Sequence, residues 1–190
     1  MTDSSRRIVV GISGASGVVY GLEMLKALRD LNYESHAVIS KGARKVFELE
    51  TETPIEEVEA AAAYLYDEDD LGASISSGSF ITGGMVVIPC SVKTLSGVAH
   101  SYNDNLLVRA ADVTLKERRP LVLVVRETPL HPGHLQLMMT AASNGAVILP
   151  PVPAFYHNPQ TIDDIVRHTV GKVLDCFRIP HNLYRRWEGA

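Results

Sequence analysis

The chain has 190 residues, of which 46% are hydrophobic and 21% charged, and its formal net charge is −4. This length is typical of one domain, and the acidic balance excludes the strongly basic surface that nucleic-acid binding requires. No apolar run reaches the roughly 20 residues that span a bilayer, and two cysteines are too few for a disulfide framework or a cysteine metal site. We therefore expect a single domain, residues 1–190, that is cytoplasmic, spans no membrane and binds no nucleic acid.

In chain order, apolar β-rich runs alternate with helical patterns. Strands are predicted at Arg7–Ile12, Ser35–Ser40, Met85–Pro89, Leu121–Val125 and Ala146–Leu149. Helical spacing begins at Val18 after the first strand and at Ile162 near the end, where Thr161 is a predicted cap with Asp164 three residues on. The acidic region 60–72 and the polar region 75–80 are interpreted as loops, and Asp67–Asp70 as solvated rather than as a magnesium site.

The alternation of strands and helices predicts the fold class. Continuous apolar strands are typical of parallel sheets that are covered on both faces. Right-handed crossovers between them give an open, doubly wound sheet. We therefore expect an α/β fold with a mostly parallel sheet between two helical layers.

A glycine-rich turn, "GISGASG", follows the first predicted strand. Glycines let a backbone approach a ligand closely, and a helix N-terminus offers unpaired N–H groups to an anion. The dinucleotide fingerprint has another spacing and needs an acidic residue about 20 residues on, whereas the second strand here ends in Ser40 and Lys41. This favours a phosphate other than that of NAD, and the alternative is a tight turn without a ligand.

Other predicted strands also end in polar residues. Ser91 and Thr94 follow the third, Arg126 and Glu127 follow the fourth, and the proline-rich loop after the last strand contains Tyr156. Their alternatives are a plain helix cap, a surface ion pair and a buried tyrosine. Because ligands of doubly wound sheets lie beyond the carboxyl ends of the strands, these residues together predict one or two phosphates bound without a metal.

Two predicted helices carry candidate cations. Arg109, Asp112 and Lys116 form one row of a helix, which taken alone is a solvated face. Lys172 flanks the apolar stripe of the last helix, where its ammonium can lie at a rim or simply in solvent. The seven histidines show no paired spacing that is typical of metal ligands.

Over nearly the whole chain the sequence resembles the UbiX family of flavin prenyltransferases. The motifs that carry this resemblance are "GISGASG", "VISKGA", "LETE", "SGSF", "GMVVIPCSVKTLSG", "RAADVTLKERRPLVLVVRETPLH", "GHLQLM", "PPVPAFYHNPQTIDDIV" and "RRW". The resemblance implies a Rossmann-like or flavodoxin-like fold, a dodecamer, and two substrates, reduced FMN and dimethylallyl monophosphate. It further implies that the prenyl group is joined to N5 and C6 of the flavin, and that the prenylated FMN serves a UbiD-type decarboxylase.

The resemblance also assigns roles to residues of this chain. FMN binding is expected at Gly14, Ala15, Ser16, Ser40, Ser91, Val92, Lys93, Thr94 and Arg126, and prenyl phosphate binding at Tyr156 and Lys172. Catalytic contributions are expected from Ser16, Glu50, Arg109, Lys116, Glu127 and Trp187, with Glu50 or the departing phosphate as base. Two positions depart from the pattern of some relatives, Lys172 in place of arginine and Val125 in place of proline.

Two other classes of function remain open at this point. One is a flavin-dependent decarboxylase of the related fold, which relies on a catalytic histidine after its first strand–helix unit. Here His36 lies inside the second predicted strand, which favours a structural role. The other class is a carrier that binds FMN without chemistry.

Overall fold

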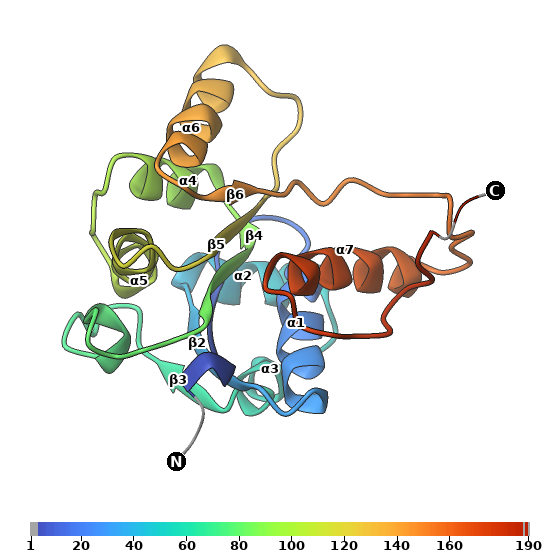
Figure 1. Cartoon of the computed structure of the whole chain (residues 1–190), viewed down its shortest axis with the longest axis horizontal. Coiled ribbons are helices and arrows are strands. Elements are labelled where there is room, and N and C mark those ends of the chain that lie inside the picture. The colour runs from blue at the N-terminus through green and yellow to red at the C-terminus, as the bar shows by residue number, and fades with distance from the viewer. Residues whose placement is uncertain (1–3, 188, 190) are drawn as a thin grey trace.

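A six-stranded, all-parallel sheet lies at the centre of the computed structural model, which describes residues 4–187 and 189 (Figure 1). Its strands are β1 (Arg7–Ile12), β2 (Glu34–Ile39), β3 (Tyr64–Tyr66), β4 (Gly84–Cys90), β5 (Leu121–Val125) and β6 (Val147–Ile148). Their order in the sheet is β3-β2-β1-β4-β5-β6. The order reverses between β1 and β4, and crevices that bind ligands form at such a point.

Helices cover both faces of the sheet, as the sequence predicts (Figure 1). They are α1 (Val19–Asp30), α2 (Lys41–Glu50), α3 (Ile55–Ala60), α4 (Val92–Ala99), α5 (Leu106–Lys116), α6 (Pro132–Ser143) and α7 (Ile162–Cys176). One buried apolar cluster joins the sheet to α1, α2, α3 and α7, and a second joins it to α4, α5 and α6. The fold is thus a three-layer α/β domain.

Side-chain caps start the helices that follow the strand ends. Ser40 accepts from Ala43 N at the start of α2, and Thr161 and Asp164 form a reciprocal capping box at the start of α7. Such caps satisfy backbone N–H groups that have no partner inside the helix. The predicted Thr161 cap is confirmed.

The acidic region contains an edge strand, which the prediction of a loop missed. β3 pairs with β2 in parallel, and the ring of Tyr64 stacks on that of His36 with centroids 4.8 Å apart. Tyr64 and Leu65 are exposed, so the segment lacks the buried apolar pattern of the other strands. The loop interpretation is correct for Asp67–Asp70, which follow β3, but the interpretation of this stretch as solvated is wrong for Glu68, which is buried because it accepts a hydrogen bond from the backbone of Lys41.

In the part of the chain that the structure describes, no helix is long and apolar enough to cross a bilayer. The segment between β6 and α7 leaves the sheet and runs to the N-terminal end of α7, where the C-terminal residues also lie (Figure 1).

Candidate active site

The ends of β1 and β4 are tied together by the buried side chain of Ser13. Its hydroxyl donates to Pro89 O at 3.0 Å and accepts from Ser91 N at 2.8 Å. These bonds fix the start of the glycine-rich turn relative to the start of α4. Ser13 is absent from the predicted site residues, because its role depends on a strand that is distant in the sequence.

The same turn also packs closely on the start of α2. A Cβ atom built at Gly14 would lie 2.9 Å from the backbone carbon of Gly42, closer than real Cβ atoms approach. Glycine at this position therefore lets two backbone segments meet at the floor of a pocket.

The start of α4 offers donors to an anion. Ser91 caps the helix by accepting from Thr94 N at 3.3 Å, and its hydroxyl donates to Thr94 Oγ1 at 3.1 Å. The N–H groups of Val92 and Lys93 belong to the first turn, which has no partners inside the helix. A phosphate placed here would gain these N–H groups and the favourable end of the helix dipole.

A pocket of about 540 Å³ lies between these elements, within the volume range typical of small-molecule sites. Its lining includes five of the predicted FMN residues, Gly14, Ser40, Ser91, Lys93 and Thr94, and adds Lys41, Gly42, Glu68, Asp69, Asp104 and Asn105. The position at the strand-order switch, the close backbone contact and the helix donors fit a phosphate-bearing flavin. We call this the strand-end pocket.

Ion pairs hold both lysines of the strand-end pocket. Lys41 Nζ lies 2.6 Å from Asp69, and Lys93 Nζ lies 3.5 Å from Asp104. The hydrogen bond and charge of Asp69 raise the pKa of Lys41 above its usual value. Glu68, a buried residue that the sequence reasoning did not select, accepts from Lys41 N at 2.7 Å and so caps α2. No spacing signal distinguished Glu68 from its acidic neighbours.

Glu50 and Arg126 stand at the ends of α2 and β5. Glu50, the last residue of α2, accepts from Gly17 N at 2.8 Å, next to the half-buried Ser16. Arg126 directly follows β5, and its backbone N–H donates to Cys90 O at 3.0 Å. Burial raises the pKa of Tyr20, and the nearby charge of Arg126 partly offsets that rise.

Glu127 and Ala15 are two more of the predicted site residues. Glu127 is exposed, and its carboxylate accepts from Thr128 N at 2.9 Å. Ala15 is buried, and its N–H donates to Ser13 O at 2.8 Å, which tightens the turn.

Tyr156 and Trp187 form a second cluster beside α7. The hydroxyl of Tyr156 lies 3.0 Å from His168 Nε2, and the ring of Trp187 meets that of Tyr156 edge-on with centroids 6.2 Å apart. Tyr156 is 51% exposed, so the alternative of a buried tyrosine is wrong.

Lys172 lies on the same helix, with its ammonium 3.5 Å from Asp175. Asp175 also accepts from Tyr184 at 2.5 Å and from Arg186 at 2.8 Å. Burial acts to raise the pKa of Asp175, but the hydrogen bonds from Arg186 and Tyr184 prevail and hold that pKa well below its usual range. Asp175 thus fastens the C-terminal segment to α7 beside Lys172.

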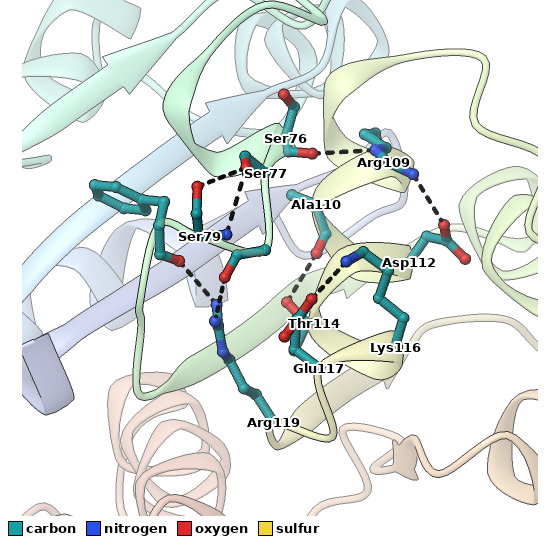
Figure 2. A network of polar contacts seen from close by, with 12 residues as sticks. Ser76, Ser77, Ser79, Arg109, Ala110, Asp112, Thr114, Lys116, Glu117 and Arg119 are labelled. Atoms are coloured by element: carbon teal, nitrogen blue, oxygen red, sulfur yellow. Dashed lines mark hydrogen bonds and ion pairs between the residues drawn. The ribbon is translucent and has the colours of Figure 1, made fainter.

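Arg109 and Lys116 lie in a third group along α5 (Figure 2). Arg109 donates to Ser76 O at 3.2 Å and to Asp112 at 3.3 Å. The side chains of Arg109 and Asp112 are partly buried, so the alternative of a solvated helix face is wrong for these two residues. Lys116 Nζ lies 2.5 Å from Glu117 Oε1, and this ammonium lowers the pKa of Glu117.

One chain does not bring these three groups together. Asn105, the cap of α5, lines the strand-end pocket, whereas Lys116 is the last residue of that helix. At a rise of 1.5 Å per residue the two ends lie about 16 Å apart. Tyr156 and Lys172 also lie outside the lining of this pocket, because the segment that carries Tyr156 runs away from the sheet (Figure 1).

Among the residues that the structure describes, no group of three histidine, cysteine, aspartate or glutamate side chains is placed to hold a metal ion. His36 is buried in β2, with Nδ1 2.9 Å from Tyr66 Oη and Nε2 2.9 Å from Glu34. This environment supports the structural role that its position in the strand predicts.

Comparison with known proteins agrees with this fold. The family model described as Flavoprotein matches residues 1–174. A relative from Salmonella typhimurium, the flavin prenyltransferase UbiX, is 61% identical over 188 residues, which is 97% of this chain and 100% of the relative. A crystal structure of AnUbiX with FMN and dimethylallyl pyrophosphate superposes with a TM-score of 0.96 at 47% identity, covering 97% of this chain and 98% of that one.

A second solved structure is that of a dodecameric FMN-dependent UbiX-like decarboxylase from Escherichia coli. It superposes with a TM-score of 0.94 at 49% identity, covering 96% of this chain and all of that one. With such identity over nearly the full length of both chains, and with a strand-end pocket suited to a phosphate-bearing flavin, the chain belongs to the UbiX family of flavin prenyltransferases.

Proposed function

We propose that this chain joins the dimethylallyl group of dimethylallyl monophosphate to N5 and C6 of reduced FMN and releases phosphate. The observation that carries the proposal is the strand-end pocket, with the close Gly14–Gly42 contact and the open N–H groups of α4, in a chain 61% identical to a flavin prenyltransferase. The two named substrates supply the ring and the allylic carbon that react; the protein supplies binding, orientation and charge.

The strand-end pocket is the proposed FMN site. Ser91, Val92, Lys93 and Thr94 would hold its phosphate at the start of α4, as helix N-termini hold anions. Gly14, Ala15, Ser16 and Ser40 would line the flavin, and Arg126 would meet it from β5. The backbone geometry at Ser13 and Gly42 preorganises these donors.

The prenyl phosphate is proposed to bind where residues of several copies of this chain meet. Lys116 lies at the end of α5 opposite to the strand-end pocket, and Tyr156 and Lys172 lie beside the C-terminal segment. All three can reach one substrate if neighbouring copies place their α5 and α7 ends at each other's pockets. A dodecameric relative supports this arrangement, and we propose a dodecamer for this chain.

The cations are proposed to do the work that a metal does in other prenyltransferases. A departing phosphate gains charge, and fixed cations and donors that meet this charge stabilise the transition state. Arg109, Lys116 and Lys172 supply positive charge, and Tyr156 and Ser16 supply hydroxyls. Glu50 and Glu127 are exposed carboxylates that can accept a proton, and Trp187 offers a ring face to the allylic cation.

The test is an anaerobic incubation of the protein with reduced FMN and dimethylallyl phosphate, followed by mass measurement of the flavin. A gain of one five-carbon unit, with release of phosphate and no loss of rate in a chelator, supports prenyl transfer without a metal. A flavin that keeps its mass while staying bound identifies a carrier, and decarboxylation of an added cysteine peptide identifies the other flavoenzyme class.

The proposed partner that uses the product is named only as a class of enzyme. The prenylated FMN would pass to a UbiD-type decarboxylase, and addition of the reaction mixture to an inactive apo-decarboxylase of this type tests that step. The cytoplasmic location expected from the sequence stays a prediction, which fractionation of cells expressing a tagged chain tests.

A further inference from the structure

The backbone at the end of α5 fixes the position of Arg119. The N–H of Arg118 donates to Leu115 O at 2.9 Å, and the N–H of Arg119 donates to Thr114 O at 2.9 Å. Arg118 adopts the left-handed conformation, with φ of 54°. These two bonds form a Schellman motif, which ends a helix in a defined direction. The direction in which the Arg119 side chain leaves the helix is therefore set locally.

From this position Arg119 binds a segment that precedes β4. One nitrogen of its guanidinium donates to Gly78 O at 2.7 Å and another donates to Phe80 O at 2.8 Å (Figure 2). We call residues 77–80 the serine loop. Because the serine loop has no helix or strand of its own, two charge-assisted bonds from one rigid fork constrain it strongly.

The serine loop in turn lies directly against the ion pair of Lys116 and Glu117 (Figure 2). A Cβ atom built at Gly78 would lie 2.1 Å from Glu117 Oε1 and 2.8 Å from Lys116 Nζ. Only a glycine leaves room for both groups at their observed positions. The serine loop therefore forms a wall that restricts where the Lys116 ammonium can go.

We propose that Arg119 is a positioning residue for the prenyl phosphate, because it holds the serine loop against Lys116 and so keeps the Lys116 ammonium aimed at its substrate. The inference rests on the proposed function, in which Lys116 meets the phosphate. A lysine side chain loses much rotamer freedom when it binds an anion. If the serine loop already restricts the Lys116 side chain before the phosphate binds, less entropy is lost on binding. The serine loop then strengthens phosphate binding without contacting the phosphate.

The first test compares Arg119→Met with Arg118→Met, which removes the same charge from an exposed neighbour at the same end of α5. Without the two bonds of Arg119, kcat/KM for dimethylallyl phosphate should fall about tenfold. The dissociation constant for FMN should stay within twofold, and Arg118→Met should change neither constant. An equal loss in both variants, or a loss of FMN binding that matches the loss of kcat/KM, would overturn the proposal.

A double-variant comparison separates positioning from general structural support. If Arg119 acts through Lys116, then Arg119→Met should cause no further loss of kcat/KM in a Lys116→Met background, since the aimed group is gone. Additive losses in the double variant would show that Arg119 acts by another route.

Gly78→Ala tests the contact between the serine loop and the Lys116–Glu117 ion pair by a change in the loop. The added methyl group meets only the ends of two flexible side chains, so the melting temperature should change little while the Lys116 ammonium is displaced. We expect kcat/KM for dimethylallyl phosphate to fall in this variant with FMN binding intact. Wild-type kcat/KM in Gly78→Ala would contradict the proposed wall.

Hydrogen exchange gives a readout that does not depend on turnover. Amides of the serine loop should exchange about tenfold faster in Arg119→Met than in the wild type and in Arg118→Met. If the exchange rates are unchanged while the wild type forms product normally, the proposed role of Arg119 in holding the serine loop is refuted and the proposed function is not. Absence of product from the wild type refutes the proposed function, whatever the exchange rates.

Discussion

The carboxylate of Glu50 accepts a hydrogen bond from the backbone N–H of Gly17 at 2.8 Å, which joins the end of α2 to the turn after β1. This contact places an acidic group next to Ser16, in the turn whose Gly14 lines the strand-end pocket. Glu50 is exposed and makes this bond with one of its two oxygens, Oε2. Its other carboxylate oxygen is left to act in the proton transfer that we propose for Glu50.

Glu50→Gln tests this role in proton transfer. Glutamine keeps an oxygen that can accept from Gly17 N, so the turn should persist, but it does not take up a proton. We expect binding of FMN within twofold of wild type and a slowing of ring closure by about 10²- to 10⁴-fold, the range for general base catalysis. Anaerobic stopped-flow absorbance measures both bond-forming steps. Completion of both at the wild-type rate would show that another group, such as the released phosphate, takes the proton.

Lys172→Ala tests the prenyl phosphate site. Loss of a charge-assisted bond to phosphate should weaken binding of dimethylallyl phosphate by about 10- to 100-fold. FMN binding should be unchanged, because Lys172 lies outside the strand-end pocket. Titration calorimetry with each substrate measures the two constants.

Two controls sharpen the Lys172 test. Lys172→Arg keeps the charge and should retain most of the affinity, and Lys26→Ala removes a lysine that pairs with Glu57 on the surface and should change nothing. If Lys26→Ala weakens binding as much as Lys172→Ala does, then net charge rather than a specific contact explains the effect.

The fold was predictable where the signal is local. The apolar runs of β1, β4 and β5 and the capping box of α7 appear in the sequence with bounds that agree to within two residues. β3 was missed because it is a three-residue edge strand in which Tyr64 and Leu65 are exposed, and only its pairing with β2 and the stacking on His36 reveal it.

The site was predictable to the same extent. The glycine-rich turn and the Ser91 cap each consist of residues that are neighbours in the sequence, and both are present in the structure. Ser13 and Glu68 are absent from the predicted site residues because their partners, Pro89 O and Lys41 N, come from other elements. The separation of Lys116 from the strand-end pocket follows from the direction of α5, which residue spacing alone does not give.

The pH dependence of stability should report on Asp175. Its pKa is lower in the folded chain than in the unfolded chain, so the unfolded chain binds more protons in acid. The stabilisation that Asp175 provides is therefore complete above about pH 4, near the unfolded pKa, and is lost progressively as pH falls below it.

Asp175→Asn provides the comparison for this pH effect. At pH 7 the variant should lose about 1–3 kcal/mol of unfolding free energy, since asparagine cannot hold Arg186 and Tyr184 as a carboxylate does. Urea denaturation from pH 7 to pH 2.5 measures the difference. The gap between wild type and variant should narrow in acid, and a constant gap would show that the charge of Asp175 is not what stabilises the segment.

Mixed oligomers test whether one active site draws on several copies of the chain. Ser91→Asp keeps a good helix cap but puts a negative charge where the FMN phosphate is proposed to bind, and Lys116→Met removes the cation at the far end of α5. Each variant alone should keep only a few per cent of the wild-type activity, about 10²-fold less for the loss of one stabilising group. Co-expressed in equal amounts, they should recover about a quarter of the wild-type activity, since an intact pocket then meets an intact Lys116 of a neighbour at random.

Two differently tagged chains, purified in tandem, ensure that only mixed oligomers are assayed. The control is a mixture of the separately purified variants that has not exchanged subunits, which should stay at the low activity of the single variants. If the pocket and Lys116 act within one chain, every chain in the mixed oligomer carries one defect and no activity returns. Recovery would therefore place Lys116 of one copy at the strand-end pocket of another, which the length of α5 requires if both meet the same substrate.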